Sequence, residues 1–159
     1  EEPPQRSRPY GAQEVLSTLQ VFNPSPRNSL MLNPDSVGRT FAGAESVTVS
    51  QSEIDAFCAV ISEGDTTVAP PTFSIRITLE QSQEILSNPE IGLDWSRVVH
   101  GDQRFEIKRP VVAGDTFKCS STIESYKVAA GNEIVTVRSD LHSIDELLVS
   151  TWSTLVVRA

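Results

Sequence analysis

The chain has 159 residues, 38% of them hydrophobic and 21% charged, which matches one globular domain with a self-sufficient core. Thirteen basic against 21 acidic residues give a formal net charge of −8, so phosphate backbones and anionic lipid surfaces are unfavourable partners. No apolar run approaches the roughly 20 residues that a membrane-spanning helix needs. We therefore expect a soluble protein with no nucleic-acid and no membrane partner.

The two cysteines, Cys58 and Cys119, lie far apart in the chain, and each has apolar neighbours. Their number and spacing exclude a disulfide framework and a metal-ligand cluster, and favour small core residues in a reducing cytoplasm. The acidic, proline-rich start of the chain lacks the apolar segment of a signal peptide. We predict a cytoplasmic protein with no metal ion and no other cofactor.

The first thirty residues differ in composition from the rest of the chain. Residues 1–30 carry five of the ten prolines around one short stretch with helical spacing, "GAQEVLSTLQVF". The only methionine, Met31, follows directly. We predict an N-terminal extension over residues 1–30 and one compact domain over residues 31–159.

A short strand and a helix open the predicted domain. Residues 46–50, "SVTVS", alternate as a strand does, and Ser50 and Glu53 then match a capping box. A helix over residues 51–62 is predicted, and Gly64 supplies its C-terminal stop. Apolar residues recur at helical spacing along it: Ile54, Phe57, Cys58 and Ile61.

The segment after "APP" allows two interpretations. Four residues from Phe73 to Leu79 alternate like a strand, and "LEQSQEILSNP" beyond them is helical up to Pro89. Pro70 and Pro71 suit the first turn of a helix instead, and a helix that is buried on nearly all sides loses its polar stripe. The alternative is therefore one long buried helix from about residue 71 to residue 87.

The last third of the chain predicts four strands in direct succession. Extended runs cover residues 95–110, with a bend at Gly101, and then residues 115–128, 132–143 and 146–158. Turn residues in "VVAGD", "AAGN" and "SID" separate them. We predict an antiparallel meander of these four strands beside the early strand, with a buried helix over one face, which is an α+β fold.

The motifs "SVTVSQSEIDAFCAVISEGD", "APPTF", "HGDQRFEIKRPVVAGDTF" and "STLVVR" resemble, in order and spacing, the MaoC-like (R)-specific hydratase/dehydratase family. The likeness is greatest to its N-terminal half-domains and to non-catalytic subunits of actinobacterial (3R)-hydroxyacyl-ACP dehydratases, and it covers about residues 33–159. It implies a single hot-dog domain, in which an antiparallel sheet of about five strands wraps around a long central helix.

Active members of this family carry a loop that resembles Gly-Asp-x-Asn-Pro-x-His, whose Asp and His handle the proton and the water at an enoyl thioester. Such chemistry needs a base of near-neutral pKa close to the substrate. Here Gly64 and Asp65 match the start of the pattern, but residues 66–68 lead straight to Ala69, without Asn-Pro and without His. The resemblance therefore implies a chain that lacks the family's base.

Two histidines remain as substitutes. His142 lies in the "DLHSID" turn and is expected to be an exposed loop residue. His100 sits at the break in a strand that should pass near the central helix, so it is either catalytic or a structural or substrate-lining residue. Asp65 and His100 are thus weak catalytic candidates, and Asp65 without a histidine is more typical of a loop carboxylate.

The resemblance also implies binding of an acyl-CoA or acyl-ACP thioester. The amides after Pro70 and Pro71 would favour negative charge on a thioester oxygen, unless these prolines only start a helix. The candidates for lining an acyl channel, unless they are ordinary core residues, which is the more common case for such residues, are Thr72, Phe73, Ile77, Val99, Gln103 and Phe105. The candidates for binding phosphate groups, unless they form a solvated face, are Arg104, Lys108 and Arg109.

Three functions are compatible with these features. The first is a non-catalytic, substrate-holding subunit that pairs with a catalytic hot-dog subunit in (3R)-hydroxyacyl thioester dehydration or enoyl thioester hydration. The second is a stand-alone homodimeric hydratase or thioesterase with an altered site, for which Glu63, Glu80 and Glu84 are further candidate acids. The third is an acyl-binding homodimer without chemistry, since one fold hosts many functions.

Overall fold

The computed structural model describes residues 32–144 and 146–159. The predicted extension over residues 1–30, with its helix-like stretch, lies outside these residues. Short 3₁₀ turns at Pro34–Ser36 (η1), Pro71–Phe73 (η2) and Trp95–Arg97 (η3) accompany two helices and five strands. The helices and strands are α1 Gln51–Ile61, α2 Ser74–Leu86, β1 Thr40–Thr48, β2 Val98–Ile107, β3 Thr116–Ala129, β4 Asn132–Ser143 and β5 Glu146–Val157.

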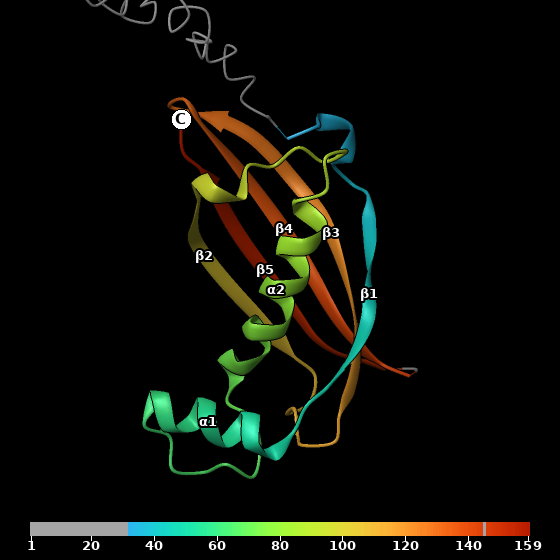
Figure 1. The fold of residues 1–159 in the computed structure, drawn as a ribbon, viewed down its shortest axis with the longest axis vertical. Coiled ribbons are helices and arrows are strands. Elements are labelled where there is room, and N and C mark those ends of the chain that lie inside the picture. The colour runs from blue at the N-terminus through green and yellow to red at the C-terminus, as the bar shows by residue number, and fades with distance from the viewer. Residues whose placement is uncertain (1–31, 145) are drawn as a thin grey trace, which may run out of the picture.

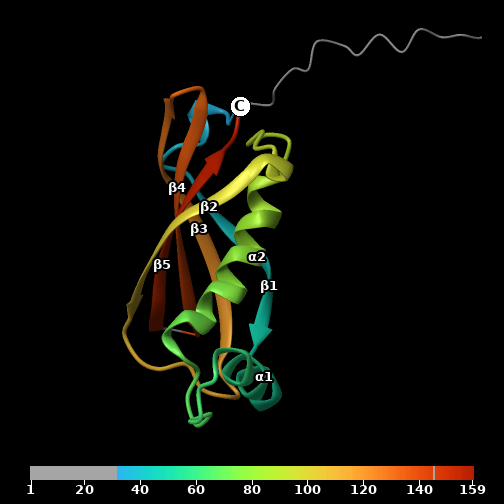
Figure 2. The same ribbon diagram turned by 90° about the vertical axis from the view of Figure 1, so that its left-hand side faces the viewer.

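One antiparallel sheet carries all five strands in the order β1-β3-β4-β5-β2. The central helix α2 lies along one side of it, with β1 and β2 at the two edges and α1 at one end (Figures 1 and 2). This arrangement confirms the predicted α+β hot-dog architecture. In the described residues no helix is long and apolar enough to span a membrane.

The predicted four-strand meander is wrong in one respect, because β2 pairs with β5 and not with β3. Only β3, β4 and β5 follow each other as neighbours in the sheet. The link over residues 108–115 is longer than the usual two to five residues of a hairpin loop, so it can run from the edge strand β2 past β5 and β4 to β3. Strand periodicity reports that a strand exists, not which strand it pairs with.

The start of α1 agrees with the prediction and its end does not. Ser50 and Glu53 form the reciprocal capping box, and the Ser50 contacts lower the pKa of Glu53 to about 2. The helix ends at Ile61, and its C-cap is Ser62, which adopts the left-handed conformation with φ 59°, two residues before the predicted stop at Gly64. Ile61 is exposed rather than part of the buried face. The carboxyl end of α1 is thus an open surface.

The segment after "APP" is helical, which excludes the strand interpretation. The 3₁₀ turn η2 begins at Pro71 and continues directly into α2. Small polar residues, rather than apolar ones alone, form the buried stripe of α2: the Ser82 hydroxyl lies 3.0 Å from that of Ser139, which lies 2.8 Å from that of Ser121. These contacts define the helix-facing side of the sheet, and the opposite side is called its outer side below.

Candidate functional site

The loop after α1 holds Asp65, the aspartate of the incomplete family motif. Its carboxylate accepts hydrogen bonds from the Thr67 backbone N–H at 2.9 Å and from the Thr67 hydroxyl at 2.6 Å. Both bonds lower the pKa of Asp65, although the side chain is exposed. The carboxylate is therefore ionised and turned back on its own loop, which is typical of a structural loop residue.

An apolar pocket of about 160 Å³ lies between this loop, the start of the central helix and the end of β2. The Ala69 backbone N–H donates to the Val111 carbonyl oxygen at 2.8 Å and joins the two lining segments. None of the acyl-channel residues proposed from the sequence lines this pocket, although the motifs "APP" and "RPVV" do contribute to it. Its lining residues are Val68, Ala69, Pro70, Pro71, Ser74, Ile107, Pro110, Val111 and Val149.

The proposed acyl-channel residues do not form one surface. Phe73 and Ile77 are buried in the core, where the Phe73 ring meets the Phe57 ring edge to face at 5.4 Å. Phe105 of β2 is paired with Thr151 of β5, and Thr151 is paired with Ser139 of β4. Paired residues share a side of the sheet, so Phe105 faces the helix as Ser139 does. Gln103, two residues before Phe105, faces the helix as well.

Val99 and Thr72 are separated from that surface. Val99 lies opposite Val156, on the outer side of the sheet, and 44% of it is exposed. Thr72 is exposed in the turn η2. A channel between α2 and the sheet can therefore use Gln103 and Phe105 but not Val99.

His100 stands at the predicted bend of β2. The register with β5 slips between His100 and Asp102, which makes Gly101 the extra residue of a bulge. The His100 Nε2 atom lies 2.9 Å from the side-chain oxygen of Gln103, which also accepts from the Ser153 hydroxyl at 2.6 Å. His142, by contrast, is exposed, as expected, but it lies in the last, turn-proximal part of strand β4 and not in a loop.

Each of the three proposed phosphate-binding cations has a carboxylate partner. Arg104 lies 3.6 Å from Glu106 and Lys108 also pairs with Glu106, whose pKa is lowered mainly by its hydrogen bond with Lys108. The Arg104 guanidinium stacks over the Trp152 ring at 4.3 Å, on the outer side of the sheet. These two cations face away from the helix.

Arg109 belongs to a tighter arrangement. It donates two hydrogen bonds of 2.9 Å to the carboxylate of Asp115, which also accepts from the Val112 backbone N–H at 2.8 Å. The bonds from Arg109 hold the pKa of Asp115 below its usual value. This ion pair closes the loop between β2 and β3, so Arg109 has a structural role in the chain as described.

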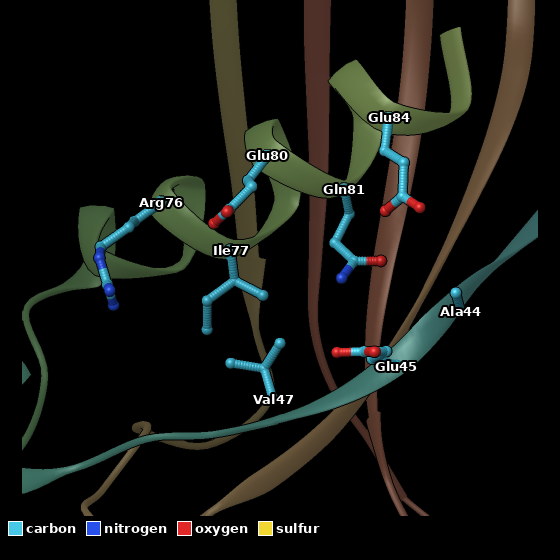
Figure 3. Close-up of a pocket in the computed structure, with 8 residues that line it drawn as sticks. All are labelled: Ala44, Glu45, Val47, Arg76, Ile77, Glu80, Gln81 and Glu84. Carbon is cyan, nitrogen blue, oxygen red and sulfur yellow. The ribbon is translucent and has the colours of Figure 1, made fainter. Parts of the chain in front are cut away.

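A second hollow, the acidic cleft, has a volume of about 350 Å³ and lies between α2 and the edge strand β1 (Figure 3). The Gln81 side-chain oxygen lies 1.9 Å from the position that a Cβ on residue 43 would take, so a side chain at Gly43 would have to displace the end of Gln81. Glu80 and Glu84, the alternative acids from the sequence, both lie in this cleft. Its lining residues are Ala44, Glu45, Val47, Arg76, Ile77, Glu80, Gln81 and Glu84.

Both cysteines are buried free thiols in the core, as expected for small core residues. Loss of solvent raises the pKa of Cys58, and it raises that of Cys119 to about 11. A thiol with a raised pKa is a poor nucleophile and a poor metal ligand at neutral pH. Within residues 32–144 and 146–159, no group of three or more His, Cys, Asp and Glu side chains is arranged to hold a metal ion.

Comparison with known proteins decides the family. The model of the FAS1-like dehydratase domain region matches residues 35–149. This chain belongs to that family. Among family relatives, the UPF0336 protein of Streptomyces griseus is 39% identical over 148 residues, which cover 82% of this chain and 97% of the relative. The UPF0336 protein of Thermobifida fusca is 36% identical over 145 residues, covering 81% and 95%.

The alignment lengths show that this family member is shortened internally. The alignment with the Streptomyces griseus protein spans 148 positions, whereas 82% of the 159 residues of this chain is about 130 residues. About 18 positions of the relative therefore have no counterpart within the aligned part of this chain. The Thermobifida fusca relative likewise has about 16 positions without a counterpart in the aligned part of this chain.

Solved structures show that the fold is that of MaoC-like dehydratases. The truncated HadBC (3R-hydroxyacyl-ACP dehydratase) complex of Mycobacterium tuberculosis matches with a TM-score of 0.67 at 23% identity, over 79% of this chain and 99% of that chain. A MaoC-like dehydratase matches with a TM-score of 0.66 at 18% identity, over 78% of this chain and 42% of that chain. The ChsH1-ChsH2 complex of Mycobacterium tuberculosis matches with a TM-score of 0.52 at 12% identity, over 76% of this chain and 83% of that chain.

Proposed function

We propose that this chain is a non-catalytic, substrate-holding subunit that pairs with a catalytic hot-dog subunit. The pair would interconvert (3R)-hydroxyacyl and trans-2-enoyl thioesters of CoA or acyl carrier protein, in cytoplasmic fatty acid metabolism. Family membership supports the dehydratase assignment, and two of the similar structures, HadBC and ChsH1-ChsH2, are complexes. The local chemistry of the loop after α1 supports the division of labour.

That loop is the observation that carries the proposal. Proton transfer next to a thioester carbonyl needs a base held close to the substrate, and histidine paired with a carboxylate is the usual solution. Among the described residues the Asp65 carboxylate bonds to Thr67 alone, and both histidines of the chain lie elsewhere, His100 on β2 and His142 at the end of β4.

The free edge of β2 is the surface proposed for pairing. In the described residues β2 has β5 as its one neighbour, so its other edge carries unpaired backbone groups. Val99 and Ile107 on this strand are exposed, at 44% and 36%, and Ile107 also lines the apolar pocket. Adding a strand of a second subunit would pair these groups and cover both side chains, beside a pocket suited to an acyl chain.

The test compares the purified chain, a catalytic hot-dog subunit of the same genome that carries an intact Asp-x-Asn-Pro-x-His motif, and their mixture. We expect hydration of trans-2-butenoyl-CoA or trans-2-decenoyl-CoA by the mixture, a heterodimer in size-exclusion chromatography with light scattering, and no turnover by this chain alone. A charged variant at the edge, Val99→Lys, should weaken the heterodimer, with Val60→Lys on the exposed surface of α1 as its control. Turnover by the chain alone would contradict the proposal.

A stand-alone thioesterase is the second candidate, and the acidic cleft favours it. Glu80 and Glu84 project from α2 toward β1 around a hollow large enough for a small acyl group (Figure 3). On this alternative the isolated chain releases free CoA from acyl-CoA, which a thiol reagent detects. The double variant Glu80→Gln, Glu84→Gln would abolish that release, and absence of release by the wild-type chain excludes the candidate.

A further inference from the structure

The bulge in β2 brings two polar side chains to one side of the strand. Residues three apart on a regular strand face opposite sides of the sheet. Here His100 lies opposite Leu155 and Gln103 lies opposite Ser153, because Gly101 is an extra residue between them. Leu155 and Ser153 are two residues apart and so share a side. His100 and Gln103 are therefore neighbours on the helix-facing side, at the free edge of the sheet.

Hydrogen bonds around Gln103 determine which nitrogen of His100 carries the proton. The Gln103 amide group donates to the Arg104 carbonyl oxygen at 3.3 Å, and its oxygen accepts from the Ser153 hydroxyl at 2.6 Å. That oxygen can only accept, so His100 Nε2, 2.9 Å away, must be the donor. In the neutral ring the Nδ1 atom is then an acceptor, and it has no hydrogen-bond partner in the part of the chain that the structure describes.

The side-chain amide of Gln103, which accepts from His100 Nε2, indicates the chemical role for which His100 is suited. A carboxylate behind a histidine stabilises the imidazolium ion that forms during proton transfer, as in an Asp-His pair. Gln103 provides a neutral amide oxygen instead, which fixes the ring and its tautomer without adding negative charge. This arrangement favours a neutral hydrogen-bond acceptor over a general base.

Pairing through β2 would bring His100 to the other subunit. Two equivalent edges related by a twofold axis run antiparallel, so the first half of β2 lies along the second half of the partner strand. In this chain the second half of β2 ends at Ile107, beside the apolar pocket and the start of the central helix. A partner of the same fold would have its corresponding pocket there, next to His100.

We propose that His100 is a specificity residue of the joint site, whose Nδ1 accepts a hydrogen bond from an amide N–H of the substrate's pantetheine arm. This inference rests on the proposed pairing with a catalytic subunit. The arm is common to CoA and carrier-protein thioesters, and its amide groups are neutral donors that match a neutral acceptor. Gln103 and Ser153 are positioning residues that hold the ring.

The experiment uses the heterodimer and two matched variants. His100→Asn keeps a hydrogen-bonding atom attached to Cγ, as Nδ1 is, whereas His100→Gln places that atom one bond further out. We expect His100→Gln to raise the KM for trans-2-butenoyl-CoA about tenfold and His100→Asn to raise it only about twofold, with kcat nearly unchanged, as for loss of one hydrogen bond. The S-ethyl thioester of the same acid lacks the arm, so its KM should not respond to either variant.

Three results would overturn the inference while the proposed function stands. They are an unchanged KM in both variants, a fall in kcat at constant KM, and an equal rise of KM for the S-ethyl thioester. A further readout needs only the isolated chain: ¹⁵N NMR of the imidazole should show the Nε2–H tautomer, and a predominant Nδ1–H tautomer would overturn the inference directly. Failure of the pairing proposal is recognised separately, by the absence of a heterodimer or of hydration activity with wild-type chains.

Discussion

The chain contains three Gly-Asp pairs, and the structure gives opposite characters to the two that lie in loops. Gly64–Asp65 lies in an open loop, where the carboxylate bonds only to Thr67 two residues on. Gly114–Asp115 closes the turn before β3, and the Asp115 side chain is only 11% exposed. Arg109 and a backbone N–H hold it there. The pair that resembles the catalytic motif is thus weakly held, whereas the other one organises its surroundings.

This contrast shows that the partners of an aspartate, not the dipeptide, determine its role. Two bonds from a guanidinium and one from a backbone N–H stabilise the charged form of Asp115 and order the loop that follows β2. That loop also contributes Pro110 and Val111 to the apolar pocket. Asp65, on the other side of the same pocket, orders nothing beyond its own turn. Four changes test the comparison.

Removal of the Asp115 carboxylate should have the largest effect. Asp115→Ala removes the acceptor of two Arg109 hydrogen bonds and of the Val112 N–H at a side chain that is only 11% exposed, which should lower the free energy of unfolding by about 2–3 kcal/mol. Urea unfolding followed by circular dichroism measures this change. Asp65→Ala is the matched control and should unfold at nearly the same urea concentration as the wild type. Equal losses in the two variants would show that the two turns are held alike.

Acid should remove the same stabilisation gradually. The pKa of Asp115 is below its ordinary value of 3.8 in the folded chain, so its ion pair is fully effective above pH 3.8 and is lost as the pH falls through the lower folded value. The difference in unfolding free energy between wild type and Asp115→Ala should therefore stay constant near neutrality and narrow in strong acid. Urea titrations at several pH values measure it, and a difference that grows toward low pH would contradict this assignment.

The glycines of the two pairs should differ less strongly. Gly114 adopts φ +92°, which an L-residue rarely takes, so Gly114→Ala should cost about 1 kcal/mol of unfolding free energy although no atom lies within 4 Å of the new Cβ. Gly64 lies outside that range of φ and is also in open space, so Gly64→Ala should be nearly neutral. Thermal unfolding of the two variants compares them, and a larger loss at residue 64 would reverse the expectation.

Much of the fold followed from sequence patterns that local physics determines. Alternation and turn residues located β4 over residues 132–143, and the capping box located the start of α1, because both depend on neighbours in the chain. The pairing of β2 with β5 was missed, since it depends on where a long link crosses the sheet.

The candidate site was harder to predict from the sequence, because it too depends on contacts between distant parts of the chain. The bend at Gly101 was predicted, but a bulge changes which side each later side chain faces, so Val99 and Gln103, both proposed for an acyl channel, lie on opposite sides of the sheet. The ion pair of Arg109 has no local sequence signature, whereas burial of Phe73 in the core was the alternative to a channel position that the sequence left open. The absence of a histidine after Asp65, in contrast, needed no structure at all.

The smallest effect concerns the hydroxyl that holds Asp65. Thr67→Ala removes the donor at 2.6 Å and leaves the backbone N–H at 2.9 Å, so the pKa of Asp65 should rise toward its ordinary value without reaching it. A ¹³C NMR titration of the side-chain carboxyl group follows this shift. The heterodimer should keep its hydration rate, because a carboxylate that faces its own loop takes no part in proton transfer. A marked loss of kcat with an intact heterodimer would instead place Asp65 in the reaction, and the weakly held Gly-Asp pair would then be the functional one.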